Sequence, residues 1–212
     1  MGRGLLMLGA TMIAMSGIPR GEVVATADQR CVMRATWTDY EALDAMRGDY
    51  ARPRITYLDG AVELMSPSND HEKLKSNIGR LVDAFCFARR IIIQPAGSWT
   101  LRSETSKAAA EPDECYVFGS DHKALPDLAI EVVWTSGGLD KLEVYRRLGV
   151  GEVWFWKDDR LTVHVLGASG YELRERSHCL PGIDLDLLVS LLDLPTLNEA
   201  VERMQALAKS LG

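Results

Sequence analysis

Residues 128–134 constrain the fold more than any other part of this chain, because a single carboxylate, Glu131, interrupts an otherwise apolar run. Short apolar runs rich in β-branched residues are typical of buried strands. Side chains alternate along a strand, so Glu131 would share a face with Asp127 and Val133. That face is either open to solvent or holds a partner for the carboxylate, since desolvating an unpaired carboxylate costs several kcal/mol. This run alone leaves both interpretations open.

The segments around this strand alternate between strand-like and helical patterns. Two β-prone runs, 54–58 and 61–65, flank Asp59-Gly60, and an Asp-Gly pair in this position predicts a tight hairpin. Apolar residues recur every three or four positions across 71–89, which predicts a long helix. The same criteria predict helices at 37–43, 139–148 (ended by Gly149) and from 195 onward, strands at 91–93, 113–118, 152–156, 161–166 and 171–174, and a loop at 107–112. This order predicts an α/β or α+β fold with helices packed on a central mixed sheet.

The chain has 212 residues, of which 47% are hydrophobic, so we expect one globular domain. Residues 1–30 form a separate case, because Arg3 followed by short apolar runs faintly resembles a signal peptide. The runs are too short to span a membrane. We therefore expect 1–30 to be a poorly ordered or artefactual extension, with export as the second interpretation, and 31–212 to be the single domain. Four scattered cysteines without a CxxC pair favour a reducing, cytoplasmic setting.

The formal net charge of −6 argues against a nucleic-acid-binding protein, because binding to phosphates usually depends on many Lys and Arg side chains. A local basic strip can still coexist with an acidic whole. The long predicted helix offers such a strip, although the same residues equally suit a solvated helix face. These residues are Lys73, Lys75, Arg80, Arg89 and Arg90.

A second carboxylate, Asp113, opens another predicted strand 18 residues before Glu131. If the two strands are neighbours, both carboxylates can reach one hard cation, and Mg²⁺ usually takes one or two carboxylates together with water and substrate phosphate. Asp113 by itself also suits an ordinary turn after proline. Lys141 follows Glu131 by ten residues and could stabilise developing negative charge, or be a solvated helix lysine.

Three further residues are weaker candidates. Glu63 lies between Val62 and Leu64 in the hairpin, so its side chain could face the same sheet surface as a metal. His71, at the start of the long helix, could belong to the site or merely suit a loop-to-helix junction. Asp127 is an alternative to Asp113, because it could share a face with Glu131.

Taken together, these segments resemble the Uma-type family of restriction endonucleases. The resemblance spans about 37–166 and rests on ordered motifs: YLDGAVELMSP at 57–67 with His71, EPDE at 111–114, PDLAIEV at 126–132, KLEVY at 141–145 and LGVGEVW at 148–154. It implies a PD-(D/E)xK nuclease core, a restriction-endonuclease-like sheet flanked by helices, with Asp113 and Glu131 as the motif carboxylates. The chain departs from the wider superfamily at Val133, where a lysine would stand, and Lys141 is the matching residue.

The resemblance implies hydrolysis of DNA phosphodiester bonds with Mg²⁺ or Mn²⁺. Asp113, Glu131 and Glu63, with a main-chain carbonyl near Val132, would hold the metal, and Lys141 would orient the water or steady the transition state. A homodimer would suit a two-strand cut. Two alternatives stay open: a catalytically degenerate binding module, which Val133 and the acidic charge favour, and a metal-dependent phosphodiesterase acting on a small substrate.

Overall fold

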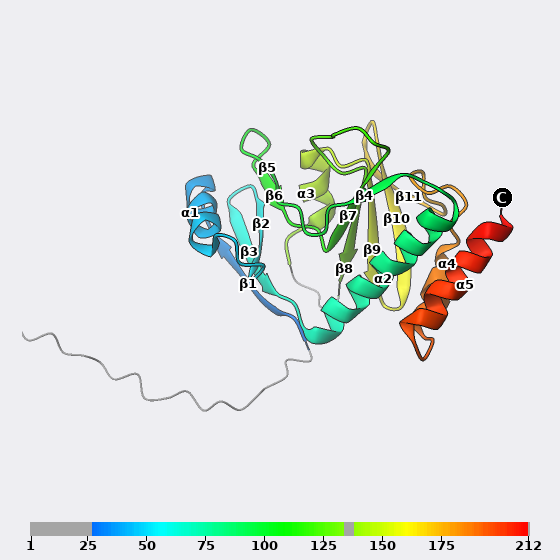
Figure 1. The fold of residues 1–212 in the computed structure, drawn as a ribbon. Coiled ribbons are helices and arrows are strands. Elements are labelled where there is room, and N and C mark those ends of the chain that lie inside the picture. Colours follow the sequence, from blue (N-terminus) through cyan, green and yellow to red (C-terminus); the bar gives the residue numbers. More distant parts are fainter. Residues whose placement is uncertain (1–26, 134–137, 212) are drawn as a thin grey trace, which may run out of the picture.

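The structure is a computed structural model that describes residues 27–133 and 138–211. Within these residues, five helices surround two β-sheets (Figure 1). The first sheet has five antiparallel strands, in the order β1 (Gln29–Arg34), β3 (Ala61–Ser66), β2 (Arg54–Leu58), β6 (Ala108–Ala110) and β5 (Leu101–Ser103). The predicted hairpin is β2–β3, and φ is positive at both Asp59 and Gly60, as a tight two-residue turn requires.

The second sheet is the mixed sheet that the sequence predicts. Its six strands run in the order β11 (Gly170–Arg174), β10 (Arg160–Gly167), β9 (Glu152–Lys157), β8 (Leu128–Val132), β7 (Glu114–Phe118) and β4 (Ile93–Pro95). Neighbours are antiparallel except for β8 and β9, which are parallel. Parallel neighbours need a crossover connection, and α3 (Lys141–Leu148) lies within it. This crossover brings the start of α3 back to the carboxyl end of β8.

The two faces of the six-stranded sheet are covered differently. On one face, Ile130 and Trp154 pack in a large apolar core with α2 (Asn69–Ala88), α4 (Leu185–Leu192) and α5 (Leu197–Ser210). On the other face, Ala129 and Val153 pack with α3 and with β5 and β6 of the five-stranded sheet. Figure 1 shows α3 between the two sheets, with α1 (Trp37–Arg47) beyond the five-stranded sheet. The six-stranded sheet therefore has one face covered by helices and the other facing α3 and the five-stranded sheet.

Local sequence signals explain where the site-bearing helices begin and end. The Ser68 side chain caps α2 by accepting a hydrogen bond from His71 N, and Asp140 caps α3 by accepting one from Glu143 N. Gly149 ends α3 in the left-handed conformation, with φ 84°, which confirms its predicted role as a C-cap. These caps place His71 in the first turn of α2 and Lys141 at the first position of α3.

The structure corrects several sequence-based expectations. Residues 91–93 are not a buried strand: β4 begins at Ile93, and Ile92 is 61% exposed. The segment 107–112 is not only a loop, since it contains the buried strand β6. Gln29 and Arg30, placed by the sequence in an extension, belong to β1. Residues 1–26 of that extension, and Trp134, lie outside the described residues. No helix of the described residues is both long and apolar enough to cross a membrane.

Candidate functional site

Asp113 and Glu131 lie opposite each other at one end of the six-stranded sheet. The β7–β8 register pairs Glu114 with Ile130, so one further step pairs Asp113 with Glu131. Residues paired in this way point to the same face of a sheet. Both side chains are buried, and Asp113 Oδ2 accepts a hydrogen bond of 2.6 Å from Val132 N. The two carboxylates predicted to converge are therefore held at the same edge of the sheet.

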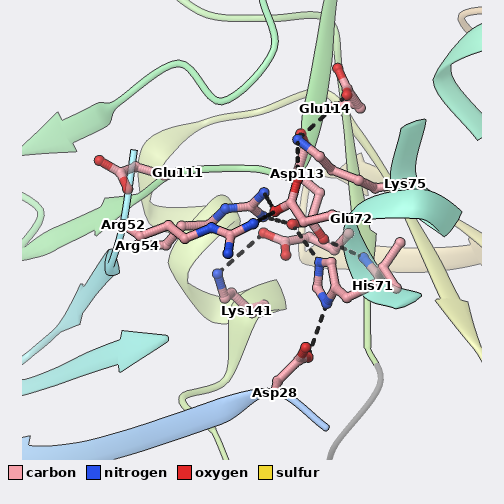
Figure 2. Close-up of polar contacts among 12 residues, drawn as sticks. Asp28, Arg52, Arg54, His71, Glu72, Lys75, Glu111, Asp113, Glu114 and Lys141 are labelled. Carbon is pink, nitrogen blue, oxygen red and sulfur yellow. Dashed lines mark hydrogen bonds and ion pairs between the residues drawn. The ribbon is translucent and has the colours of Figure 1, made fainter. Parts of the chain in front are cut away.

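Asp113 is surrounded by positively charged or proton-donating groups from other elements (Figure 2). Arg54, the first residue of β2, makes an ion pair with Asp113 Oδ1 and also lies 3.1 Å from Glu72 Oε1. His71 Nε2 lies 2.9 Å from the same Asp113 oxygen. Both sheets therefore contribute to the site: Arg54 comes from the five-stranded sheet, and Asp113 directly precedes β7 of the six-stranded sheet.

His71 joins Asp113 to the beginning of the described chain. Its imidazole is fully buried, with Nδ1 2.9 Å from Asp28 Oδ2 and Nε2 2.9 Å from Asp113 Oδ1. Asp28 also accepts a hydrogen bond of 2.9 Å from Ser68 N. Burial alone would raise the pKa of Asp28, but the hydrogen bonds from His71 and Ser68 lower it. His71 therefore links two carboxylates and is not a simple helix-junction residue.

Glu131 takes its partners from α3. Lys141 Nζ lies 3.2 Å from Glu131 Oε1, and the Tyr145 hydroxyl donates a hydrogen bond to the same oxygen. Residues four apart share one side of a helix, so α3 presents both groups together. Burial and the charge of Glu131 raise the pKa of Tyr145 well above its usual value, which keeps the hydroxyl protonated as a donor. Glu131 is thus the paired, buried carboxylate that the sequence left as one of two interpretations.

Glu63 is held beside the entry to α3. It is buried, lies 3.5 Å from Arg30 Nε, and accepts a hydrogen bond of 2.7 Å from Leu139 N. A Cβ at Gly138 would overlap the ends of the Arg30 and Glu63 side chains, which would have to shift to make room for it. Among the described residues, no hydrogen bond or ion pair joins Glu63 to Asp113 or Glu131.

Asp127 lies at the other end of β8. Four residues along a strand correspond to roughly 13 Å, so Asp127 is remote from Glu131. Its carboxylate accepts a hydrogen bond of 2.7 Å from Phe118 N and pairs with Lys123. The structure therefore does not bring Asp127 to the carboxylate pair. In the predicted basic strip, Lys75 pairs with Glu72 and Glu114, and the other four cations are exposed on α2 or just after it.

The donor groups fit a hard divalent cation in kind. Asp113 and Glu131 offer carboxylate oxygens, and Mg²⁺ usually takes one or two carboxylates with water and phosphate. Within the described residues, Glu131 Oε2 has no hydrogen-bond partner and is free to bind, whereas Asp113 Oδ1 is engaged by Arg54 and His71. No group of three or more His, Cys, Asp or Glu side chains is close enough to hold an ion in this part of the chain. The fit is that of a two-carboxylate site whose charge is balanced by Arg54 and Lys141.

Four members of this cluster were missed by sequence reasoning. Arg54 lies in a β-prone run, Asp28 and Arg30 lie in the segment expected to be an extension, and Tyr145 follows the apolar spacing of its helix. Their partners are distant in sequence, as with Asp28 and His71, so no local spacing reveals them. The sequence signal that could have pointed to such residues is a polar side chain within an otherwise apolar strand, such as Arg54 before Ile55.

Comparison with known proteins identifies the family. A family model described as "Putative restriction endonuclease", named Uma2, matches residues 37–196. Among solved structures, a "putative nuclease" from Anabaena variabilis matches with 13% identity and a TM-score of 0.45, covering 76% of this chain and 96% of that one. No curated protein matches the chain. Since this family model matches well over half of the sequence, the chain belongs to the Uma2 family.

Proposed function

We propose that this protein is a metal-dependent nuclease that hydrolyses phosphodiester bonds in DNA. Asp113 and Glu131 would be its principal metal-binding carboxylates, with Mg²⁺ or Mn²⁺ as the metal. The observation that carries the proposal is the pairing of Asp113 with Glu131 across β7 and β8, with Lys141 in contact with Glu131. Membership of the Uma2 family supports a nuclease activity.

A metal bound there would neutralise charge on the phosphate and lower the pKa of a bound water. Asp113 must release Arg54 from Oδ1 before this oxygen can act as a ligand, because the guanidinium contacts it directly. Arg54 would then be free to contact a phosphate oxygen, since a guanidinium suits phosphate geometry. Glu63, held by Arg30 and Leu139, is the more remote third carboxylate of the proposal.

Lys141 would supply the positive charge that the wider superfamily takes from the position of Val133. Val133 directly follows the end of β8, two residues beyond Glu131, so along an extended chain its side chain would point to the same side as Glu131. The start of α3 returns to that face and brings Lys141 Nζ within 3.2 Å of Glu131. From this place the ammonium can contact the attacking water or a phosphate oxygen and stabilise charge as it develops. The contact supports the transfer of the lysine's role from β8 to α3.

The proposal is tested by a cleavage assay on plasmid DNA with Mg²⁺, with Mn²⁺ and with EDTA. We expect nicked or linear DNA with either metal and intact plasmid with EDTA. A generic phosphodiester assayed beside the plasmid distinguishes a small-substrate phosphodiesterase, which would cleave the small ester and leave the plasmid intact. Absence of plasmid cleavage with both metals would contradict the proposal.

A second candidate, a catalytically degenerate binding module, is favoured by one observation. Each of the three carboxylates already has a cationic partner: Arg54 on Asp113, Lys141 on Glu131 and Arg30 on Glu63. These pairs leave no net negative charge that must attract a metal. Titration with Mn²⁺ separates the two candidates, because a degenerate site should bind the ion weakly or not at all.

A further inference from the structure

A cavity of about 710 Å³ opens beside Glu131 and Lys141. It is lined by the end of β8, the start of α3 and the β9–β10 hairpin, with Arg30 of β1 and Met65 of β3. Its volume lies in the range of pockets that hold small molecules, roughly 300–1,000 Å³. A metal ion and its waters need far less room, so the cavity can accept a part of the substrate next to the reacting phosphate.

The floor of the cavity is set by strand register. Glu131 of β8 pairs with Phe155 of β9, and Phe155 pairs with Thr162 of β10. His164, two residues beyond Thr162, points to the same face. The Phe155 ring is half-buried and meets the His164 ring edge-on, with ring centroids 5.6 Å apart. Burial lowers the pKa of His164, so its imidazole is neutral near pH 7. Glu131 and Phe155 therefore lie side by side on neighbouring strands, on the same face of the sheet.

Two cations stand at the rim of the same cavity. Lys157 and Arg160 pair across the β9–β10 hairpin, and both are exposed. Like charges directly opposite each other in a sheet are destabilising. Neither takes part in an ion pair with any carboxylate of the described residues. Two adjacent cations of this kind suit the phosphates of a nucleic-acid backbone.

Resting on the proposed nuclease function, we infer that this cavity receives one unstacked nucleotide of the DNA substrate, with its base on Phe155 and its phosphates at Lys157 and Arg160. In a duplex the faces of each base are covered by its neighbours, and only base edges are open in the grooves. An aromatic ring at the floor of a cavity can stack only on a base that has left the stack. The site therefore favours single-stranded DNA over duplex DNA.

Fluorescence anisotropy with a labelled single strand and with the matching duplex, both in EDTA to prevent cleavage, tests the inference. The wild type should bind the single strand more tightly. Phe155→Leu should weaken single-strand binding about tenfold, which corresponds to about 1.4 kcal/mol, and leave duplex binding unchanged. The matched control is Phe87→Leu, because Phe87 is 64% exposed on α2 and remote from the cavity lining. Equal single-strand affinity for Phe155→Leu and the wild type would overturn the inference.

The rim is tested separately with exposed residues whose replacement does not threaten the fold. Replacing both Lys157 and Arg160 by alanine should reduce the slope of log affinity against log salt by about 1.4 for a single strand, at about 0.7 for each phosphate that is no longer neutralised. The control, Arg203→Ala with Lys209→Ala, replaces two exposed cations of α5 outside the cavity lining and should leave the slope unchanged. An unchanged slope after replacement of Lys157 and Arg160, or an equal reduction in the control, would overturn the inference.

A competition experiment distinguishes a cavity that binds a nucleotide within a DNA strand from one that binds a free nucleotide. Deoxyadenosine monophosphate should displace the labelled single strand only at far higher concentrations than an unlabelled strand does. Equal potency would overturn the assignment in favour of a free nucleotide. Failure of the nuclease proposal would be seen elsewhere, as absent Mg²⁺-dependent cleavage by a protein that still prefers the single strand.

Discussion

The parallel strands β8 and β9 carry buried carboxylates at both ends, and the two ends are built differently. At one end, Glu131 is partnered by Lys141 and Tyr145 of α3, and Asp113 by Arg54 and His71. At the other end, Glu152, which is paired with Leu128, is as deeply buried. Its donors are all neutral: the Trp154 indole, the Ser177 hydroxyl, and the main-chain N–H groups of 178 and 179.

The difference lies in the kind of partner and not in the depth of burial. Glu152 is bound by fixed dipoles of one strand and one loop, which cannot move away without unravelling that loop. Lys141 and Arg54 are long side chains with many rotamers, so they can swing from a carboxylate to a phosphate. A buried carboxylate balanced by mobile cations can exchange them for a metal and a substrate, whereas one saturated by neutral donors anchors the fold. The comparison supports the proposal of metal chemistry at the first end and a structural role at the second.

Removal of a site carboxylate should have the largest effect. Glu131→Ala is expected to lower Mg²⁺-dependent DNA cleavage by about 10³-fold, or about 4 kcal/mol of barrier, because it deletes a proposed metal ligand. The rate is measured as plasmid nicking under single-turnover conditions, and circular dichroism checks the fold. Undiminished cleavage by a folded Glu131→Ala variant would break the distinction between the two ends.

Replacement of the carboxylate at the opposite end should lower the stability of the fold. Glu152→Gln is expected to lower the free energy of unfolding by about 3 kcal/mol, because an amide cannot accept all four hydrogen bonds that the carboxylate accepts. Urea denaturation measures the change, and Glu131→Gln serves as the matched replacement. The protein that remains folded should keep its cleavage rate. A loss of cleavage in Glu152→Gln without a loss of stability would reverse the assignment.

Replacement of one lysine at each end gives a matched comparison with a smaller expected effect on the cleavage rate. Lys141→Ala is expected to reduce the cleavage rate about 10²-fold, the scale of one charge-stabilising donor. Lys123→Ala removes the partner of Asp127 at the far end and should leave the rate unchanged. Single-turnover rates of both variants under identical conditions give the result. Equal effects of the two replacements would show that the loss depends on net charge and not on position.

The smallest effect is expected at Asp127, the alternative ligand suggested by the sequence. Asp127→Ala should leave cleavage within about twofold of the wild type and cost about 1 kcal/mol of stability, through loss of the hydrogen bond from Phe118 N. Cleavage and urea denaturation are measured on the same preparation. A loss of cleavage approaching that of Glu131→Ala would place the metal site at the Asp127 end of β8 and contradict the proposal.

Much of the fold could be predicted where its signals are local. The Asp59-Gly60 turn, the αL cap at Gly149 and the apolar run of β8 each depend on neighbouring residues. The five-stranded sheet was only partly foreseen. Its strands β5 and β6 have three residues each, and β6 is Ala108–Ala110, without the β-branched residues that mark strands. These short strands form through pairing across the sheet and not through local preference.

The convergence of Asp113, Glu131 and Lys141 could be predicted from the family motifs, whereas contacts between distant segments could not. Arg54 reaches Asp113 from another sheet, and Asp28 reaches His71 across 43 positions. Such pairs leave no period or spacing in the sequence. Tyr145 fits the apolar stripe of its helix, so its hydroxyl on Glu131 becomes evident only in three dimensions.

The most direct test is a crystal structure of the protein soaked in Mn²⁺, with anomalous scattering used to locate the ion. We expect an anomalous peak between the carboxylates of Asp113 and Glu131, with Arg54 moved away from Asp113, and no peak at Glu152. A fully occupied Mn²⁺ site elsewhere, or none at these two carboxylates at saturating Mn²⁺, would contradict the assignment of this end of the sheet as the metal centre.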